Sequence, residues 1–183
     1  MSEVKAARRI IMIKHLLLAA AVITTALGWS MTSSAAESYL ESEKLVSVES
    51  DVKEIKFLTQ QIHEGINEYR AERNLSPLSL NSYISQQAEI HSQNMAQQAV
   101  KFSHDGFEAR IQALDGFVVY RRAAENVAYN QGYENPARKA ISGWIESKGH
   151  HKNMVGDFDL TGIGVAKNKQ GEYYFTQIFI KEN

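Results

Sequence analysis

Apolar residues recur every three or four positions in several segments, which is the spacing of one face of an α-helix. The first such segment is expected to begin near Ser50-Asp51, residue types that cap helices, and to stop near Asn74. Its apolar stripe consists of Ile55, Leu58, Ile62, Ile66 and Tyr69.

Three further helices are predicted downstream. Asn81 is expected to cap a helix that runs to about Gln98, with a buried face on which His91 is a hydrogen-bonded, partly buried histidine. A short helix over 107–114 follows the turn at Asp105-Gly106. Asn135-Pro136 has the composition of a helix start, and Gly149 is expected to end that helix as a C-cap.

The chain closes with a predicted hairpin. The segments 160–168 and 172–181 are rich in β-branched and aromatic residues and flank the turn-type sequence NKQG. The segment 123–130 could be a further strand or an extended stretch. Both faces of the last strand carry apolar residues, so helices should cover both faces of the sheet. The fold class is therefore α+β, a three-layer α-β-α sandwich.

The N-terminus has the order of a secretory signal peptide: a basic region, an apolar stretch of 12 residues and then small residues. A membrane span needs about 20 apolar residues, so we predict cleavage after Ala36 and no stable membrane insertion afterwards. The alternatives are an uncleaved anchor and a buried core helix, and Met12 could be the true start. The predicted organisation is a signal peptide over 1–36, a linker or lead-in over 37–49 and a single domain over 50–183.

The composition excludes several classes of protein. Without cysteine the chain has no disulfide, no lipid-anchoring cysteine and no thiol nucleophile, and 147 mature residues are enough for a core without disulfides. That mature part carries 16 Lys and Arg against 20 Asp and Glu, a net charge of −4, with no basic run. We therefore expect neither nucleic acid nor an anionic membrane surface as the main partner.

Common catalytic signatures are absent. The sequence contains no phosphate-binding glycine loop, no H-E-x-x-H helix and no G-x-S-x-G elbow. The remaining candidate chemistry consists of His and Glu in loops or at helix ends, namely His104, Glu125, Glu146, His150 and His151.

Six segments occur in an order that resembles the CAP superfamily of cysteine-rich secretory, antigen 5 and pathogenesis-related proteins, in particular its bacterial secreted members. The resemblance covers about 55–179. It implies an α-β-α sandwich with a central, mainly antiparallel sheet. The segments are INEYRAERNLSPLSLN, AEIHSQNMA, FSHDGF, AENVA, GWIESKGHHKNM and LTGIGVAKNKQGEYYFTQIF.

The resemblance also implies a cleft of two His and two Glu that can hold zinc or another divalent cation, although no cofactor is required. His104, Glu125 and His150 match three of these positions. The fourth match is weak, because Glu146 lies one position early and Ser147 stands at the expected place. Two His and one Glu could bind the ion while Glu146 acts as a base. A polar network that only holds loops together is the alternative.

Other motif residues are expected to be structural. Arg70 should brace a helix end or a carboxylate, and Trp144 should anchor its helix in the core. Gly162 and Gly164 should permit close backbone approach or a bulge. We expect His151 to be a solvent-facing neighbour of His150. Asn67 matches a family signature on the first helix, and Asn126 and Asn153 have short amides suited to satisfying buried backbone groups in loops.

The leading functional hypothesis is a secreted protein whose cleft binds an unknown extracellular ligand: lipid, sterol, glycan or peptide. The second is a metal-assisted hydrolase or peptidase, and the third is a structural or adhesive envelope protein. The fold is shared by proteins with all these roles and does not choose among them.

Overall fold

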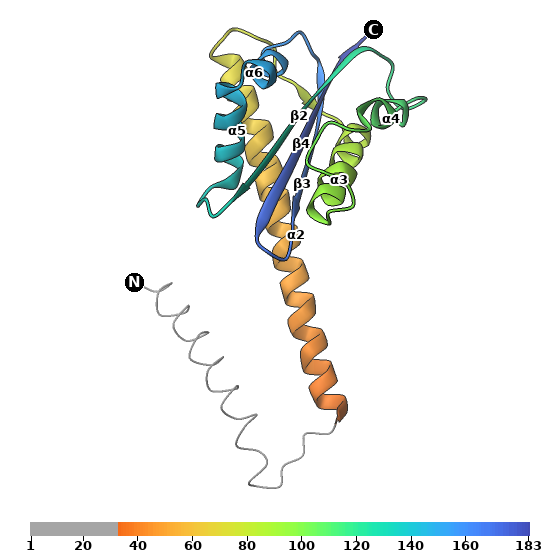
Figure 1. The fold of residues 1–183 in the computed structure, drawn as a ribbon, viewed down its shortest axis with the longest axis vertical. Helices are drawn as coiled ribbons and strands as arrows, with labels where there is room; N and C mark the ends of the chain where they lie inside the picture. Colours follow the sequence, from red (N-terminus) through yellow and green to blue (C-terminus); the bar gives the residue numbers. More distant parts are fainter. Residues whose placement is uncertain (1–32) are drawn as a thin grey trace. The chain divides into compact units, whose positions relative to one another are not determined.

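The computed structural model describes residues 33–183, and a sheet lies at the centre of residues 50–183 (Figure 1). Its strand order in this part of the chain is β1-β3-β4-β2. β3 and β4 form the predicted hairpin, β2 pairs antiparallel with β4, and the short β1 pairs parallel with β3. The sheet is therefore mixed and mainly antiparallel. The strands are β1 (Ser79–Leu80), β2 (Tyr120–Gln131), β3 (Leu160–Lys167) and β4 (Glu172–Glu182).

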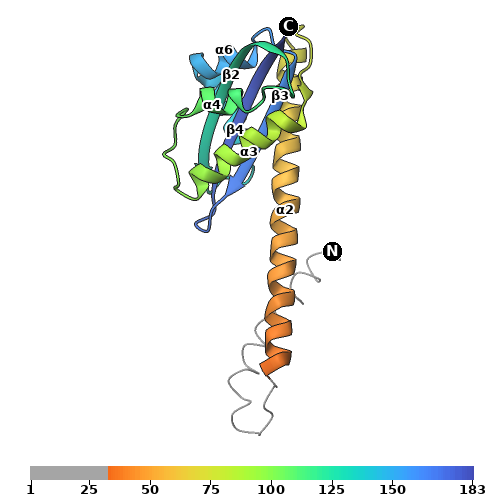
Figure 2. The same ribbon diagram turned by 90° about the vertical axis from the view of Figure 1, so that its right-hand side faces the viewer.

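Helices cover both faces of this sheet, which confirms the three-layer sandwich (Figures 1 and 2). The part of α2 beyond Ser50 lies on one face with α5 and α6, and α3 and α4 lie on the other. The helices are α2 (Ser33–Ala71), α3 (Ser82–Ala96), α4 (Phe107–Gln112), α5 (Pro136–Glu146) and α6 (Lys148–Met154).

The predicted start of the first long helix is wrong. α2 begins at Ser33 and continues through Ser50-Asp51, because a cap-type residue inside a helix can turn its side chain to solvent without ending the helix. The stretch 37–49, expected as a linker or lead-in, is helical with exposed side chains. It belongs to a separate unit that ends at Glu49, whereas Ser50–Asn183 form one compact unit.

Most of the predicted signal peptide, residues 1–32, lies outside the described residues, and the predicted cleavage point after Ala36 lies within α2. From residue 33 onward, no helix is both long and apolar enough to span a bilayer.

Two predicted helix starts are confirmed by their caps. The Asn81 side chain accepts hydrogen bonds from the backbone of Tyr83 and Ile84 at 3.0 and 3.2 Å. The Asn135 side chain accepts from the backbone of Arg138 at 2.9 Å, with Pro136 as the first helical residue. Each cap satisfies amide groups that the first turn of a helix leaves without an internal partner.

The predicted role of Gly149 as a C-cap is wrong. α5 already ends at Glu146, and Ser147, in an extended conformation, separates it from α6. Gly149 lies in the first turn of α6, so His150 and His151 are helical residues. A glycine near a helix end is only a statistical stop signal, and here the chain starts a second helix instead.

The core is divided by the sheet. On the α2 side, Ile62, Ile66 and Trp144 pack against Phe175 and Phe179 of β4. On the α3 side, Ile84 and Ala88 pack against Ile178 and Ile180. Alternate β4 residues therefore serve opposite layers, as strand geometry requires.

Gly162 and Gly164 bring α3 unusually close to β3, as predicted. A Cβ atom at Gly162 would lie 2.3 Å from the backbone carbon of Ile84, and one at Gly164 would lie 2.2 Å from that of Ala88. Only hydrogen at these positions lets the helix rest on the strand.

Candidate functional site

The candidate site forms where β2 passes between α4 and α6, and it rests on two adjacent residues. Glu125 and Asn126 are both buried, and neighbouring strand residues point to opposite faces of a sheet. The Glu125 side chain meets His104 and Arg110, whereas Asn126 turns to α6. This alternation divides the site in two: a charged side around Glu125 on one face of the sheet, and an amide side around Asn126 on the other face.

The amide side holds α6 against β2. The Asn126 amide donates to the backbone oxygen of His150 at 3.1 Å. The Asn153 amide donates to the backbone oxygen of Glu125 at 3.2 Å and to the Asn126 side chain at 2.8 Å. β2 is an edge strand, and these bonds together with that of Trp144 Nε1 to the backbone oxygen of Val127 (3.0 Å) cover part of its edge. The same bonds fix the position of His150.

The charged side is a three-residue arrangement around a buried carboxylate. Glu125 Oε1 lies 2.9 Å from His104 Nδ1 and 2.8 Å from Arg110 Nη2, and Oε2 accepts from Arg110 Nε at 2.9 Å. The Arg110 contact is a bidentate ion pair, the strongest geometry available to a guanidinium and a carboxylate. An ionised carboxylate only accepts, so Nδ1 of His104 carries the proton and Nε2 is left for other partners.

The imidazole rings of His104 and His150 lie close to each other. Their ring centroids are 6.2 Å apart with an interplanar angle of 53°. The His104 side chain is 50% exposed, and His150 is half-buried. Burial lowers the pKa of His150, and the neighbouring His104 lowers it further. The neutral form of His150 is therefore favoured. We call His104, Arg110, Glu125 and His150 the histidine site.

Arg70, on α2, supports the end of α6, which lies on the same face of the sheet. Arg70 is 2% exposed, and its guanidinium donates to the backbone oxygens of Met154 at 2.8 Å, Gly156 at 2.9 Å and Ser76 at 2.9 Å. Burial lowers its pKa, an effect that Asp157 and Asp159 oppose. The structure thus places Arg70 at a helix end, bonded to backbone carbonyls.

The remaining motif residues are held inside the scaffold. The Asn67 side chain bonds both backbone groups of Leu78, at 2.8 and 3.0 Å. His91 is buried, with Nε2 2.9 Å from the backbone oxygen of Ser103, so it joins α3 to the loop that carries His104. His151 differs from its predicted solvent-facing role: it is half-buried, with Nε2 3.0 Å from the Tyr69 hydroxyl.

Glu146 stands apart from the other predicted ligands. It is exposed in the last turn of α5, and no hydrogen bond or ion pair joins it to His104, Glu125 or His150 in the described part of the chain. Within residues 33–183, no three His, Asp or Glu side chains are grouped closely enough to hold a metal ion.

The donor set as arranged does not fit a zinc ion. Both Glu125 oxygens are bonded to Arg110, and one of them also to His104 Nδ1. A zinc ion bound by this carboxylate would lie beside the guanidinium charge and would have to displace it. The chemistry that the arrangement offers without rearrangement is hydrogen bonding through two imidazoles.

Arg110 is the site residue that sequence reasoning missed. It follows the Asp105-Gly106 turn by one helical turn, and its Nη1 also donates to the backbone oxygen of Asp105 at 2.9 Å. An arginine in the short helix after a motif histidine was the available signal. No local pattern identifies its partner, which lies 15 positions away in the sequence.

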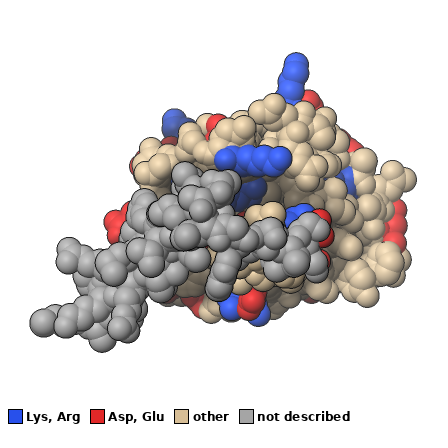
Figure 3. Space-filling model, turned by 90° about the horizontal axis from the view of Figure 1, so that it is seen from below, with Lys and Arg blue, Asp and Glu red and all other residues tan. Residues whose placement is uncertain are grey.

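Three cavities lie elsewhere on the surface, and none is lined by a residue of the histidine site. Their volumes are about 470, 330 and 610 Å³. On the face shown in Figure 3, Lys and Arg side chains are scattered among uncharged and acidic residues. The visible part of that face, where no grey atoms lie, therefore shows no continuous basic surface.

Comparison with known families identifies the class. Residues 63–179 match the model of the Cysteine-rich secretory protein family, CAP. This match covers more than half of the chain, and the chain belongs to that family. In this member of the family, the described residues place the guanidinium of Arg110 on the Glu125 carboxylate.

Two relatives come from Bacillus subtilis. The membrane protein YlbC is 33% identical over 127 residues, which cover 67% of this chain and 34% of YlbC. The protein YkwD is 28% identical over 142 residues, which cover 76% of this chain and 53% of YkwD. The chain thus spans about half, or less, of the length of these relatives.

The chain is also similar to proteins of known structure. An extracellular protein with an SCP domain from Bacillus anthracis is 30% identical, with a TM-score of 0.59, over 69% of this chain and 41% of that one. An outer surface protein from Borrelia burgdorferi is 20% identical, with a TM-score of 0.60, over 70% of this chain and 95% of that one. The second likeness concerns the fold alone.

Proposed function

We propose that this protein acts outside the cytoplasm and binds a polar ligand at the histidine site. The observation that carries this proposal is the Glu125–His104 contact of 2.9 Å, which orients the imidazole and leaves Nε2 without a partner in residues 33–183, while the His150 ring centroid lies 6.2 Å from that of His104. The extracellular assignment rests on the signal-like N-terminal sequence and on the extracellular relative from Bacillus anthracis.

The two imidazoles favour a ligand with hydroxyl or amide groups. Since Nδ1 of His104 is bonded to Glu125, Nε2 is the ring nitrogen of His104 that can meet a ligand. Neutral His150 has one accepting and one donating nitrogen, and no hydrogen bond of its ring is made within residues 33–183. The pair can therefore serve two groups of one ligand. A purely apolar lipid or sterol tail would leave these nitrogens without partners.

A zinc-dependent hydrolase is less well supported. It requires Glu125 to leave Arg110, and it requires Glu146 to approach from an exposed position. Neither rearrangement is favoured by a contact in the described residues. An adhesive envelope role remains compatible with ligand binding, since a bound glycan or peptide would supply the adhesion.

NMR of the histidine side chains tests the proposal. The full mature chain is titrated separately with a chitin oligosaccharide, a short peptide and phospholipid vesicles. We expect a polar ligand to shift the imidazole signals of His104 and His150, and His104→Gln or His150→Gln to weaken binding by about tenfold, as the loss of one or two hydrogen bonds predicts. His151→Gln, which changes the adjacent histidine bonded to Tyr69, is the matched control and should bind normally.

Two results would contradict the proposal. One is the absence of any shift at His104 and His150 with all three probes. The other is micromolar zinc binding that moves both imidazoles and is required for ligand binding, which would restore the metal centre.

A further inference from the structure

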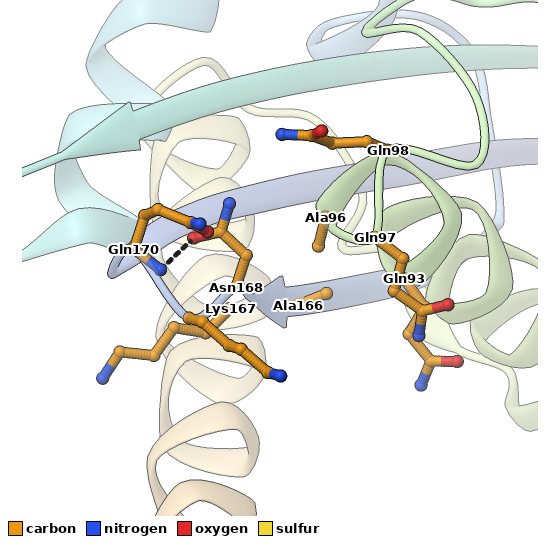
Figure 4. A pocket seen from close by; sticks show the side chains of 9 residues that line it. Gln93, Ala96, Gln97, Gln98, Ala166, Lys167, Asn168 and Gln170 are labelled. Atoms are coloured by element: carbon orange, nitrogen blue, oxygen red, sulfur yellow. Dashed lines mark hydrogen bonds between the residues drawn. The ribbon is translucent and has the colours of Figure 1, made fainter.

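A second polar surface lies at the far end of the sheet from the histidine site along β2. A cavity of about 470 Å³ opens between the end of α3 and the β3–β4 turn. In Figure 4, Gln93 and Gln97 lie on the α3 side and Gln170 on the turn, with Gln98 extending from the helix end toward the turn. We call this the glutamine pocket.

Its carboxamides are available to a ligand. The side chains of Gln93, Gln97, Gln98 and Gln170 make no hydrogen bond with any residue in 33–183, so their donors and acceptors are unused by the protein. Asn168 differs, since its side chain already accepts from the backbone of Gln170 and Glu172 at 3.0 Å and stabilises the turn. Each free carboxamide offers two N–H donors and one accepting oxygen. A sugar hydroxyl, which both donates and accepts, matches that combination.

An aromatic row extends from the floor of the pocket. Ala96 and Ala166, which line the pocket, pack in one cluster with Tyr174. The Tyr174 ring centroid is 5.2 Å from that of Tyr129, and Tyr129 is 6.2 Å from Phe102. Tyr129 and Phe102 are 45% and 51% exposed. Exposed rings with polar groups beside them suit a ligand that has apolar faces and a polar edge, as a pyranose does.

The row also leads back to the histidine site. Glu125 and Tyr129 are four residues apart on β2 and therefore share a face, about 14 Å apart along the strand. Phe102 lies two residues before His104 in the same loop. The histidine site and the aromatic row thus lie on the same face of the sheet, and the row crosses from Tyr129 on β2 over Tyr174 on β4 to Ala166 at the end of β3, where the glutamine pocket lies.

The charges at the pocket do not favour an anion. Lys167 Nζ lies 2.7 Å from Glu54 Oε2, and this ion pair raises the pKa of Lys167 while it neutralises the charge locally. Lys169 is then the single lysine of the lining without a carboxylate partner in the described residues. The polar lining of the pocket therefore consists mainly of the four neutral glutamine carboxamides rather than of positive charge.

We propose that the glutamine pocket and the aromatic row bind a neutral, hydroxyl- and acetamide-bearing glycan chain that continues to the histidine site. This inference rests on the proposed ligand-binding function and names its ligand class. The glycan stacks sugar faces on Tyr129 and Phe102, and the glutamines bond its hydroxyl and acetamide groups.

The test is a titration of the full mature chain with tetra-N-acetylchitotetraose, followed by calorimetry and by amide side-chain NMR signals. We expect shifts at Gln97, Gln98 and Gln170 and affinity losses of about tenfold for both Tyr129→Ala and Gln97→Met. Tyr133→Ala removes another exposed aromatic ring, 51% exposed and outside the row, and should bind like the wild type. Gln97→Met leaves no buried group without a partner, so it keeps the test valid if Tyr129→Ala fails to fold.

The outcomes separate this inference from the proposed function. Binding of the glycan that is unaffected by both Tyr129→Ala and Gln97→Met, but lost in His104→Gln, overturns the glutamine pocket and leaves the histidine site intact. Binding of only the peptide or the vesicles overturns the glycan assignment. Binding lost in Tyr129→Ala and Gln97→Met but normal in His104→Gln supports the pocket and contradicts the histidine site.

Discussion

Arg70 and Arg110 carry the same group on opposite faces of the sheet, yet their partners differ in kind. Arg70 is 2% exposed and bonds backbone oxygens at the end of α6 and in the loops beside it. Arg110 bonds the Glu125 carboxylate, which in turn orients a half-exposed histidine. Backbone carbonyls do not titrate or move toward a ligand, so the Arg70 side is a scaffold. On the Arg110 side, by contrast, the half-exposed His104 imidazole remains able to contact a ligand.

Arg70→Met gives the largest expected loss. Three or more backbone oxygens would lose a charged donor in a buried place, which we expect to cost about 3–5 kcal/mol of unfolding free energy. Urea unfolding measures it. Arg73→Met is the control, since that arginine is partly exposed, and should cost less than about 1 kcal/mol. Equal losses in the two variants would remove the scaffold role of Arg70.

Gly164→Ala tests how closely α3 must pack against β3. The added methyl would meet the backbone of Ala88 at 2.2 Å, so α3 must move, at a cost of about 2–3 kcal/mol. Thermal and urea unfolding measure this cost. Gly149→Ala is the matched control, because its new methyl has nothing within 4 Å and lies in a helix. We expect it to be neutral or slightly stabilising. If Gly164→Ala unfolds at the same urea concentration as the wild type, α3 can move away from β3 without a loss of unfolding free energy.

Arg110→Met sharpens the contrast between the two arginines. It leaves Glu125, whose side chain is 2% exposed, with His104 alone, and the loss of hydrogen bonds to this charged group should cost about 2 kcal/mol. The freed carboxylate could then join His104 and His150 around zinc, so calorimetry should detect tighter zinc binding than in the wild type. Arg121→Met, at an exposed arginine, should change neither quantity. Unchanged zinc affinity in Arg110→Met would show that the guanidinium does not block the metal.

The smallest expected effect is the pH dependence of stability. Burial lowers the pKa of His91 and His150 in the folded protein, so as pH falls below about 6.5 the unfolded chain takes up protons first. Stability should decline from there and level off below the folded-state pKa values. Glu54 and Asp159, whose pKa values are lowered, act only nearer pH 4.

Urea midpoints at pH 7.5 and 5.5 measure this dependence. His91→Gln and His150→Gln should each reduce the difference between the two midpoints, and the double variant should reduce it further. A difference that the double variant leaves unchanged would assign the effect to other groups.

Much of the layered fold follows from the sequence alone. The caps at Asn81 and Asn135, the hairpin and the close approach at Gly162 and Gly164 depend on local stereochemistry, which a few neighbouring residues determine. The start of α2 and the role of Gly149 were predicted wrongly, because a cap residue or a glycine permits a helix end without requiring it.

The candidate site shows the opposite case. Residue type and order single out His104, Glu125 and His150, and with them the family. Whether Glu125 faces a metal or a guanidinium depends on where α4 lies against β2, and that is decided by packing between segments distant in the chain. The glutamine pocket likewise joins the end of α3 to a turn far along the chain. The sequence by itself therefore determined which side chains are available, and the tertiary structure decided which of them meet, because contacts between distant segments carry no local sequence signal.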